Sequence, residues 1–398
     1  MLLAIALSGC QGGKVEPQSP TASSRSPTAG QPSPVGATES PISTLVSTFI
    51  PSSNPGPIST ISAPCSGHDA SWRQTNVLEG FYPHKGIAEE EGCKIWLVGE
   101  QVGAIHQGIL VYSEDGGNTL HVIAKWKQVA NLWSVARGPG GVLWVAGSTT
   151  EGSGFLAKSI DNGQNWAEIS LPWPTTNINA LAISGEGLWI CAEEGNNLYL
   201  FVSSDGEKDW REGISLAGTR DQGVPPRWSD ISARGNTVMA VGSNGTQGII
   251  AISLDEGRTF HLASYDGKTT LFSSISLVDA NQAYIGGYYT SSGRSEDAIP
   301  VLLLTRNGGN SFQQIAVPTK NDMVVATLFQ AVSQGYVILG SNIDTYKVSD
   351  ENGGGSLKWE DMPLMPKPEV LGGNASLFAS TDGTIYRMEL GGLYRILP

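Results

Sequence analysis

Acidic side chains recur along the sequence at a fixed place beside a hydroxyl group and a glycine. Ser253, Asp255 and Gly257 occupy alternate positions of one octapeptide, which closes with Phe260. Carboxylates in pairs are the machinery of glycoside hydrolysis. A short acidic side chain also accepts hydrogen bonds from the amides of a tight turn, and glycine supplies a positive φ. The sequence favours the second role and predicts a hairpin turn whose closing aromatic anchors the next strand.

The same octapeptide is copied along the chain with substitutions. The copies hold Ser113, Asp115 and Gly117; Ser159, Asp161, Gly163 and Trp166; Ser203, Asp205 and Trp210; Thr305, Asn307, Gly309 and Phe312; and, in a stretched form, Ser349 and Trp359. Successive copies begin 44–52 residues apart. Three apolar segments precede each turn and one follows it, so the repeat predicts a four-stranded unit of the length of a propeller blade.

The predicted strands fall into three series within the repeats. First strands are expected at 132–136, 178–183, 228–233, 272–277 and 329–333; second strands, ending near glycine, at 95–99, 143–147, 188–192, 238–242, 283–287 and 336–340; third strands at 109–112, 155–158, 199–202, 249–252, 301–304 and 345–348. A last unit with a degraded turn spans 377–397, and 71–75 resembles a strand that follows a turn and is expected to close the ring against it. The predicted fold class is all-β, a single seven-bladed β-propeller with four antiparallel strands per blade; six or eight blades stay open.

The turn pattern resembles the Asp-box, or bacterial neuraminidase, repeat family from about residue 70 to the end. This resemblance implies a sialidase-like propeller whose boxes are structural and lie opposite the ligand face. Sialidases carry an Arg-Ile-Pro segment, and the nearest match here, Asp297-Ala298-Ile299-Pro300, has no arginine. We therefore carry over no sialidase activity and predict no catalytic residue.

The ligand face is expected in the loops between second and third strands and in the connections between repeats. The candidate ligand-face residues are Trp173, Arg227, Trp228, Tyr288, Tyr289 and Arg294. Aromatic rings of this kind stack on sugars, or else they pack at blade edges. The same loops hold scattered carboxylates, which leaves a glycoside hydrolase of unrecognised type open.

The repeat rhythm and the N-terminal segment also resemble the photosystem II stability/assembly factor propellers and their relatives. That resemblance covers about residues 70–398 and implies a protein-binding role and no specific site. Members of that family are expected to present a basic patch, whereas this chain has a net charge of −13. The acidic balance argues against nucleic acid as a partner. The five histidines show no metal-ligand spacing, so we predict no metal and no cofactor, and we expect a monomer.

The N-terminus predicts an anchor and a tether. Residues 1–10 end in Leu-Ser-Gly-Cys, which looks like a lipoprotein lipobox, and Cys10 is then the lipidated residue; the alternative is a chance cysteine in an apolar end. Residues 11–66 are rich in Ser, Pro and Thr and predict a disordered tether. Residues 67–398 form the propeller. The expected location is extracytoplasmic, with the lipid holding the protein to a membrane at the cell surface or in the periplasm.

The other cysteines have separate predictions. Cys65 and Cys93 are a possible disulfide in an oxidising compartment. Cys191 aligns with apolar second-strand positions and is predicted to be a buried free thiol. Taken together, the sequence predicts a non-enzymatic, lipid-anchored propeller that binds an unknown protein or glycan. A glycoside hydrolase and a purely structural envelope protein are the alternatives.

Overall fold

The computed structural model describes part of residues 46–398, the second of two units of the chain. The described residues are 73–75, 78–89, 93–103, 106–219, 225–263, 265, 268–269, 271–291, 299–317, 328–332, 336–340, 345–349, 357–363, 376–380, 383–389 and 392–397. The predicted lipobox with Cys10 and the predicted tether up to residue 66 lie outside them, so both remain predictions.

The described chain is all-β apart from one short 3-10 turn, η1 (Pro139–Gly141). Its strands form seven antiparallel four-stranded sheets, and six of these use four consecutive strands each. The six are β2 (Phe81–Ala88), β3 (Ile95–Gln101), β4 (Gln107–Ser113), β5 (His121–Trp126); β6 (Val129–Arg137), β7 (Leu143–Thr149), β8 (Gly154–Ser159), β9 (Ala167–Glu168); β10 (Asn177–Ser184), β11 (Gly187–Glu194), β12 (Asn197–Ser203), β13 (Arg211–Ala217); β14 (Arg227–Arg234), β15 (Thr237–Ser243), β16 (Gly248–Ser253), β17 (His261–Leu262); β18 (Leu271–Leu277), β19 (Ala283–Tyr289), β20 (Ile299–Thr305), β21 (Gln313–Ile315); and β22 (Leu328–Val332), β23 (Tyr336–Gly340), β24 (Thr345–Ser349), β25 (Lys358–Asp361).

The remaining sheet corrects the prediction of seven like blades. It combines β26 (Ser376–Ala379), β27 (Ile385–Glu389) and β28 (Gly392–Ile396) with β1 (Arg73–Gln74) from the other end of the chain. Counted as complete four-stranded repeats, the propeller has six blades rather than the predicted seven, and the composite sheet closes the ring. The predicted closing contact of 71–75 is confirmed for β1, where Arg73 pairs with Arg395 and Gln74 with Tyr394.

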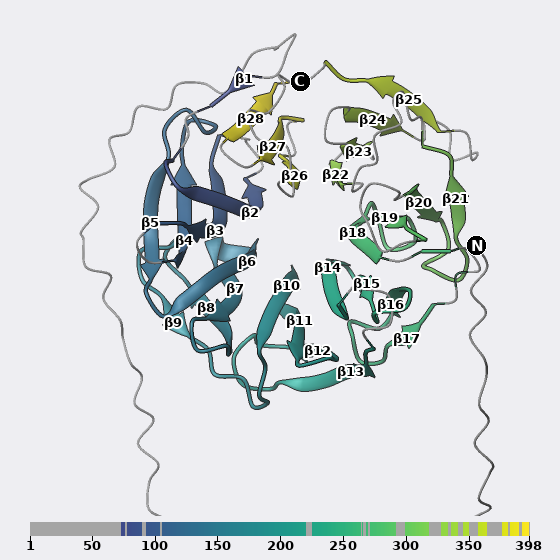
Figure 1. Cartoon of the computed structure of the whole chain (residues 1–398), viewed down its shortest axis with the longest axis horizontal. Helices are drawn as coiled ribbons and strands as arrows, with labels where there is room; N and C mark the ends of the chain where they lie inside the picture. Colours follow the sequence, from purple (N-terminus) through teal and green to yellow (C-terminus); the bar gives the residue numbers. More distant parts are fainter. Residues whose placement is uncertain are drawn as a thin grey trace, which may run out of the picture. The chain divides into compact units, whose positions relative to one another are not determined.

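The first strands of the sheets form the inner ring of the propeller. β2, β6, β10, β14, β18, β22 and β26 contact one another in that cyclic order, and β26 contacts β2. In Figure 1 these strands surround the centre of the ring, and the fourth strand of each sheet lies at the outside. The ring therefore closes within the second unit.

The predicted strands of the repeats are confirmed with small changes of boundary. The first strand of the first blade, β2, was not predicted. Each repeated turn lies between a third and a fourth strand, as expected, because β4 pairs with β5 and β8 with β9 on either side of it.

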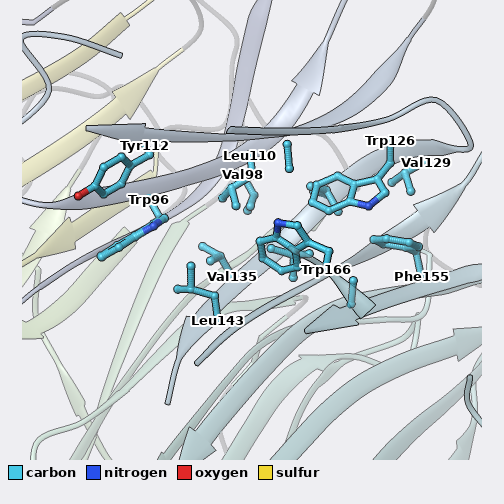
Figure 2. Packing of buried hydrophobic residues seen from close by; sticks show 14 residues of the cluster. Trp96, Val98, Leu110, Tyr112, Trp126, Val129, Val135, Leu143, Phe155 and Trp166 are labelled. Atoms are coloured by element: carbon cyan, nitrogen blue, oxygen red, sulfur yellow. The ribbon is translucent and has the colours of Figure 1, made fainter. Parts of the chain in front are cut away.

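Aromatic side chains fill the space between neighbouring blades. Between the first two blades, Trp126 meets Phe155 and Trp166 edge to face, with ring centroids 5.6 and 5.3 Å apart. Trp166, the closing aromatic of its turn, is 7% exposed. Figure 2 shows this cluster. Buried aromatic pairs of this kind stabilise beyond the area they bury, so the closing aromatic joins two blades.

Among the described residues, no helix has the length and apolar character to cross a membrane.

Candidate functional site

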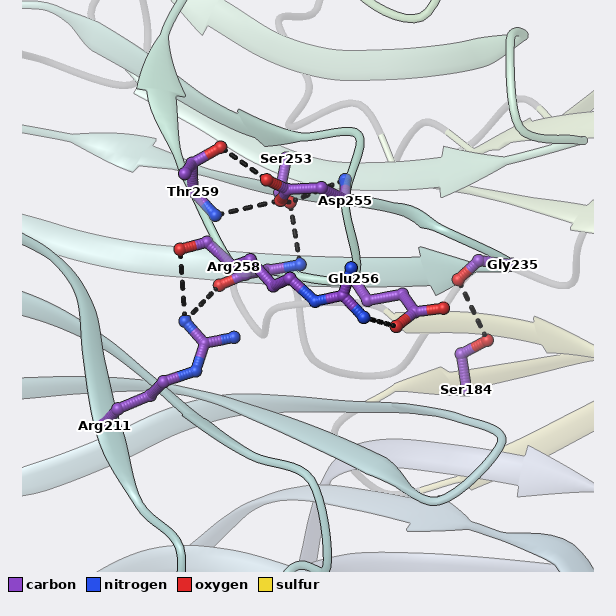
Figure 3. A network of polar contacts seen from close by, with 9 residues as sticks. Ser184, Arg211, Gly235, Ser253, Asp255, Glu256, Arg258 and Thr259 are labelled. Atoms are coloured by element: carbon purple, nitrogen blue, oxygen red, sulfur yellow. Dashed lines mark hydrogen bonds and ion pairs between the residues drawn. The ribbon is translucent and has the colours of Figure 1, made fainter.

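The repeated turn binds its own backbone. In the copy after β16, the hydroxyl of Ser253 donates to Asp255 Oδ1 (2.7 Å) and accepts from the amide of Gly257 (2.7 Å). Asp255 also accepts from the amide and the hydroxyl of Thr259, at 2.9 and 2.7 Å. Figure 3 shows this network. Every oxygen of the carboxylate thus has a donor within the turn.

The other copies repeat these contacts. The amides of Gly117, Gly163 and Gly309 donate to the hydroxyls of Ser113, Ser159 and Thr305, and Asp115, Asp161 and Asn307 take the place of Asp255. In the copy at Ser203, Asp205 accepts from two turn amides and Asp209 accepts from Ser203 and Ser204. Residues 350–356 of the copy at Ser349 lie outside the described part.

The glycine of the turn also leaves room for a tryptophan side chain of the neighbouring blade. A Cβ built on Gly257 would lie 2.3 Å from Nε1 of Trp189, which belongs to the preceding blade, and the φ of Gly257 is +76°. Gly206 has the same relation to Trp144, at 2.7 Å. Arg211 of the preceding blade donates to the carbonyl of Gly257 at 2.7 Å. The turn is therefore a joint between blades.

These contacts keep the turn carboxylates ionised. Hydrogen bonds from the Thr259 hydroxyl and amide and from Ser253 lower the pKa of Asp255 to about 2. A glycosidase acid needs the opposite, a pKa raised toward the working pH. Because they have already lost their protons at neutral pH, these side chains are unsuited to act as general acids.

Asparagine is expected to replace Asp255 at little cost. Asn307 already accepts from the Ser311 amide (3.0 Å) and donates to its hydroxyl (2.8 Å) in its own copy. We expect Asp255→Asn to lower the free energy of unfolding by less than about 1 kcal/mol and Asp255→Ala by about 1–2 kcal/mol, because alanine leaves turn amides without an acceptor. Urea unfolding at pH 7 measures both; equal losses for the two variants would contradict the role of the turn contacts.

The same pair of variants has a pH dependence with a fixed sign. Asp255 has a lowered pKa when folded, so its stabilisation is present above its usual value of 3.8 and is lost as the pH falls toward 2. Asp255→Asn should therefore lose less stability than the wild type over that interval.

The opposite end of each blade carries a repeated β-bulge. Third strands run parallel to first strands, so the turns lie where the first strands end and the bulges lie near where they begin. At least one extra residue enters the first strand of five blades: His84, Trp133, Asn179, Ser229 and Ser273, with a second one, Ala130, in β6. We call this end of the propeller the bulge end. Bulges of this kind redirect side chains and are common beside functional sites.

The bulge explains the glycine at the end of the second strand. A Cβ on Gly147 would lie 1.9 Å from the carbonyl oxygen of Asn131, and one on Gly242 would lie 2.1 Å from that of Arg227. In these two blades the first-strand carbonyl lies so close to the second strand that a Cβ would clash with it. The third blade carries Ala192 at this register.

Side chains cap the inner edges of the innermost strands. The Ile275 amide donates to Asp230 (3.2 Å), and the Leu277 amide donates to Ser232 (3.3 Å), both across from β18 to β14. The Leu181 amide likewise donates to Ser134 at 3.2 Å. An exposed strand edge is a template for pairing with another chain, and these contacts occupy it.

An ion pair crosses the inside of the ring. Lys85 Nζ on β2 lies 2.7 Å from Asp230 Oδ1 on β14, and the two side chains are 30% and 16% exposed. β6 and β10 separate these strands on one side of the ring, and β18, β22 and β26 on the other. The pair therefore joins blades that are not neighbours.

Breaking this pair on one side only is expected to destabilise the ring. We expect Lys85→Met or Asp230→Asn alone to lower the free energy of unfolding by about 1–3 kcal/mol, below the cost for fully buried pairs because both groups keep some solvent. The double variant Lys85→Met/Asp230→Asn should lose less than the sum of the two, with a coupling of about 1 kcal/mol in a double-mutant cycle. Strict additivity in urea unfolding would show that the pair contributes nothing.

Glu193 is the described carboxyl whose pKa is raised. Burial is the main cause and raises its pKa from 4.5 to about 7, against the hydrogen bond from Asn179, the charge of Arg227 and the Trp228 amide. Asn179 Nδ2 also contacts the Trp228 carbonyl at 3.1 Å. Glu193 thus links the third and fourth blades at the bulge end.

Five buried polar atoms on the first strands, near their bulges, have no hydrogen-bond partner among the described residues. They are His84 Nε2, Trp133 Nε1, Asn177 Oδ1, Trp228 Nε1 and Ser229 Oγ, and we call these five residues the unpaired cluster. They come from the first strands of four consecutive blades. The rings of His84 and Trp133 lie 4.2 Å apart at an angle of 35°. Each unpaired buried atom costs free energy that a bound partner would return.

The structure places the predicted ligand-face residues in different surroundings, and their role stays a prediction. Trp228 is 1% exposed and belongs to the core, and Trp173 stacks on Phe201 with ring centroids 4.4 Å apart. Tyr288 and Tyr289 are partly buried, and Lys268 lies 5.7 Å from the ring centroid of Tyr289.

Arg227 is exposed beside Glu193, and Arg294 lies outside the described residues.

The residues that the sequence analysis missed are His84, Lys85, Trp133, Asn179 and Asp230. The glycine that recurs near the end of most second strands was the signal in the sequence that could have located them.

The cysteines are partly described. Cys191 is a fully buried free thiol, as predicted, and burial raises its pKa. Cys93 is in a disulfide, while Cys65 lies outside the described residues, so the pairing of the two remains a prediction. Among the described residues, no group of three or more His, Cys, Asp or Glu side chains is placed to hold a metal ion.

Comparisons with known proteins support the architecture. No protein-family model and no curated protein matches the chain. The solved structure "YCF48 bound to D1 peptide" is similar at 13% identity and a TM-score of 0.57, covering 85% of this chain and all of that one. The WD40 β-propeller domain of Doa1 is similar at 13% identity and a TM-score of 0.55, covering 82% of this chain and 96% of that one. Both likenesses concern the fold alone, and with the cyclic order of the sheets they establish that this chain folds as a β-propeller.

Proposed function

We propose that the protein is a non-enzymatic binding module that holds a protein segment or a glycan at its bulge end. The observation that carries this proposal is the unpaired cluster, where the first strands of four consecutive blades hold buried polar atoms without partners among the described residues. At the turn end, by contrast, the polar side chains of the repeated turn are bound to their own backbone. The similar YCF48 structure holds a peptide, which supports a binding role for a propeller of this kind.

The family and the location belong to the same proposal. The repeated turn, with its Ser, Asp and Gly contacts, supports membership of the Asp-box repeat family. The lipobox-like sequence before Cys10 supports a lipid anchor and an extracytoplasmic location. Metabolic labelling with an alkyne fatty acid tests the anchor: the wild type should be labelled and Cys10→Ser should not.

Site-specific cross-linking of the full-length chain tests the binding end. A photoreactive phenylalanine analogue at Tyr289 reports on the bulge end, and the same analogue at Leu254, which is 46% exposed, reports on the turn end. The expected result is a discrete cross-linked partner from position 289 and none from position 254. Partners captured only at position 254 would overturn the proposal.

A glycoside hydrolase is the second candidate, and Glu193 is the observation that favours it. A carboxyl with a pKa of about 7 still holds its proton near neutral pH, as a general acid must. Hydrolysis of an aryl-glycoside panel by the wild type but not by Glu193→Gln would replace the binding proposal with this one.

A further inference from the structure

β13 is the longest of the fourth strands in the described part of the propeller. It has seven residues, against six in β5, four in β25, three in β21 and two each in β9 and β17. It is the last strand of its sheet, and within the described residues it pairs with β12 alone. In Figure 1 it lies along the outside of the ring. The third blade therefore ends in a long strand edge.

The outer edge of β13 carries backbone groups that no described residue binds. The Gly218 amide donates to the Asn196 carbonyl at 3.0 Å, which makes these two residues a hydrogen-bonded pair. Hydrogen-bonded and non-hydrogen-bonded pairs alternate along an antiparallel ladder, so Ser215 and Ala217 form pairs of the second kind with β12. The N–H and C=O groups of both residues therefore point away from β12. Both residues are exposed, and such groups are a template for another strand.

The edge of β13 lacks the features that keep other strand edges unpaired. Natural proteins protect open edges with short strands, charged side chains or proline. Residues 213–217 read Gly-Ile-Ser-Leu-Ala and contain neither a charge nor a proline. By contrast, β5 carries Lys125, and β25 ends in Glu360 and Asp361. The bulge of β13 lies at Gly213, so the remainder of the edge is regular.

One face of β13 offers an apolar surface to an added strand. Ile214, Leu216 and Phe260 are partly buried and pack against a hydrophobic cluster shared by the third and fourth blades. Side chains alternate between the two faces of a strand, so Ser215 and Ala217 lie on the other face. An added strand would place every second side chain beside Ile214 and Leu216. Apolar residues at those positions would form stabilising cross-strand pairs.

The free charge at this edge is negative. Arg211, at the start of β13, donates to the carbonyls of Gly257 and Arg258 at 2.7 and 3.3 Å. Glu212 is exposed and forms no ion pair with a described residue. Charge complementarity therefore favours a partner with a basic residue opposite Glu212. A second copy of this chain fits poorly, because it brings another net charge of −13 and because so short a pairing buries less area than a stable dimer needs.

We propose that the outer edge of β13 binds an extended peptide segment of another protein, which becomes the fifth strand of the third blade. The segment runs antiparallel, like the pairs already in this sheet. It is apolar on the face beside Ile214 and Leu216, and it carries a basic residue near its C-terminal end, opposite Glu212. Main-chain hydrogen bonds supply the affinity of such strand addition, and side chains supply its selectivity. The inference does not rest on the proposed function, because it uses no residue of the unpaired cluster.

Peptides of defined sequence test this inference with the full-length protein in detergent. The probe alternates valine and threonine and ends in a C-terminal lysine amide; one counterpart has N-methylated central amides, and another has glutamate in place of the lysine. Calorimetric titration measures the affinity, and hydrogen exchange of the Ser215 and Ala217 amides locates the bound peptide. Ser215→Pro removes an N–H that points outward and leaves the pairing with β12 in place. Ser215→Thr is its matched control and keeps that N–H.

The lysine peptide should bind and should slow the exchange of the Ser215 and Ala217 amides. Ser215→Pro should weaken its binding about 10-fold or more, and Ser215→Thr should leave it unchanged. The glutamate peptide should bind more weakly, and the N-methylated peptide should not bind. No binding of the lysine peptide, or equal binding of the N-methylated one, refutes the inference; this comparison holds even if Ser215→Pro fails to fold.

The protein without peptide distinguishes the other occupants of the edge. The Ser215 and Ala217 amides should exchange fast, because nothing binds them. Slow exchange in a monomer would show that another part of this chain covers the edge. Slow exchange in a dimer that Ser215→Pro dissociates, measured by sedimentation, would show that a second copy covers it. In either case the edge is closed to a partner protein, and the inference is wrong.

Discussion

Gly147→Ala is expected to lower the free energy of unfolding by about 3 kcal/mol, at the upper end of what overpacking costs. The new methyl carbon would lie 1.9 Å from the Asn131 carbonyl oxygen and 3.0 Å from the Leu132 Cα. Both neighbours are backbone atoms of a bulged strand, so the methyl group forces a backbone shift in a blade that is packed around glycine, whereas the third blade is packed around Ala192. Urea unfolding followed by tryptophan fluorescence measures the loss.

Gly103→Ala is the control for this change. No atom lies within 4 Å of a Cβ built on Gly103, which is exposed and has no positive φ. Its substitution should change the free energy of unfolding by less than about 0.5 kcal/mol. If the two alanine variants proved equally stable, the close approach of the first-strand carbonyl would not constrain the second strand as described.

Glu193→Gln should raise the free energy of unfolding by about 3 kcal/mol above pH 8 and leave it unchanged near pH 4. The folded-state pKa of Glu193 is about 7 against a usual 4.5, and each unit of difference corresponds to about 1.4 kcal/mol. Because the folded pKa is raised, wild-type stability falls as the pH rises from about 4.5 to 7 and then levels off. Glutamine keeps an acceptor for Asn179 and has no charge to bury.

The measurement is a series of urea unfolding curves from pH 4 to pH 8.5. Glu194→Gln serves as the neighbouring control and should keep the wild-type fall in stability, since it leaves Glu193 in place. A Glu193→Gln profile that runs parallel to the wild type would show that burial does not hold the proton on this carboxyl.

The strands were predictable because the repeated turn fixes their order. Ser253, Asp255 and Gly257 specify a hairpin through contacts made within five residues, so the pattern reads directly from the sequence. β2 was missed because its sequence, with Pro83, His84 and Lys85 inside it, does not alternate apolar and polar residues. The composite sheet was predicted only in part, because its turn has lost the pattern.

The candidate site was much harder to predict. A bulge depends on how two strands pair, and no residue type specifies it alone, as the different bulged residues His84 and Trp133 show. The contact of Lys85 with Asp230 joins residues 145 positions apart through ring closure. The predicted Trp173 and Trp228 were instead drawn into packing, because large aromatic side chains bury wherever neighbouring blades leave room.

The Lys85–Asp230 pair has a consequence for the passage of ligands through the ring. Because it spans from β2 to β14, its side chains lie across the axis of the propeller at that level. While the pair is intact, its two side chains narrow any path along the axis at that level. A ligand at the proposed binding end would then enter and leave on the same side of the ring.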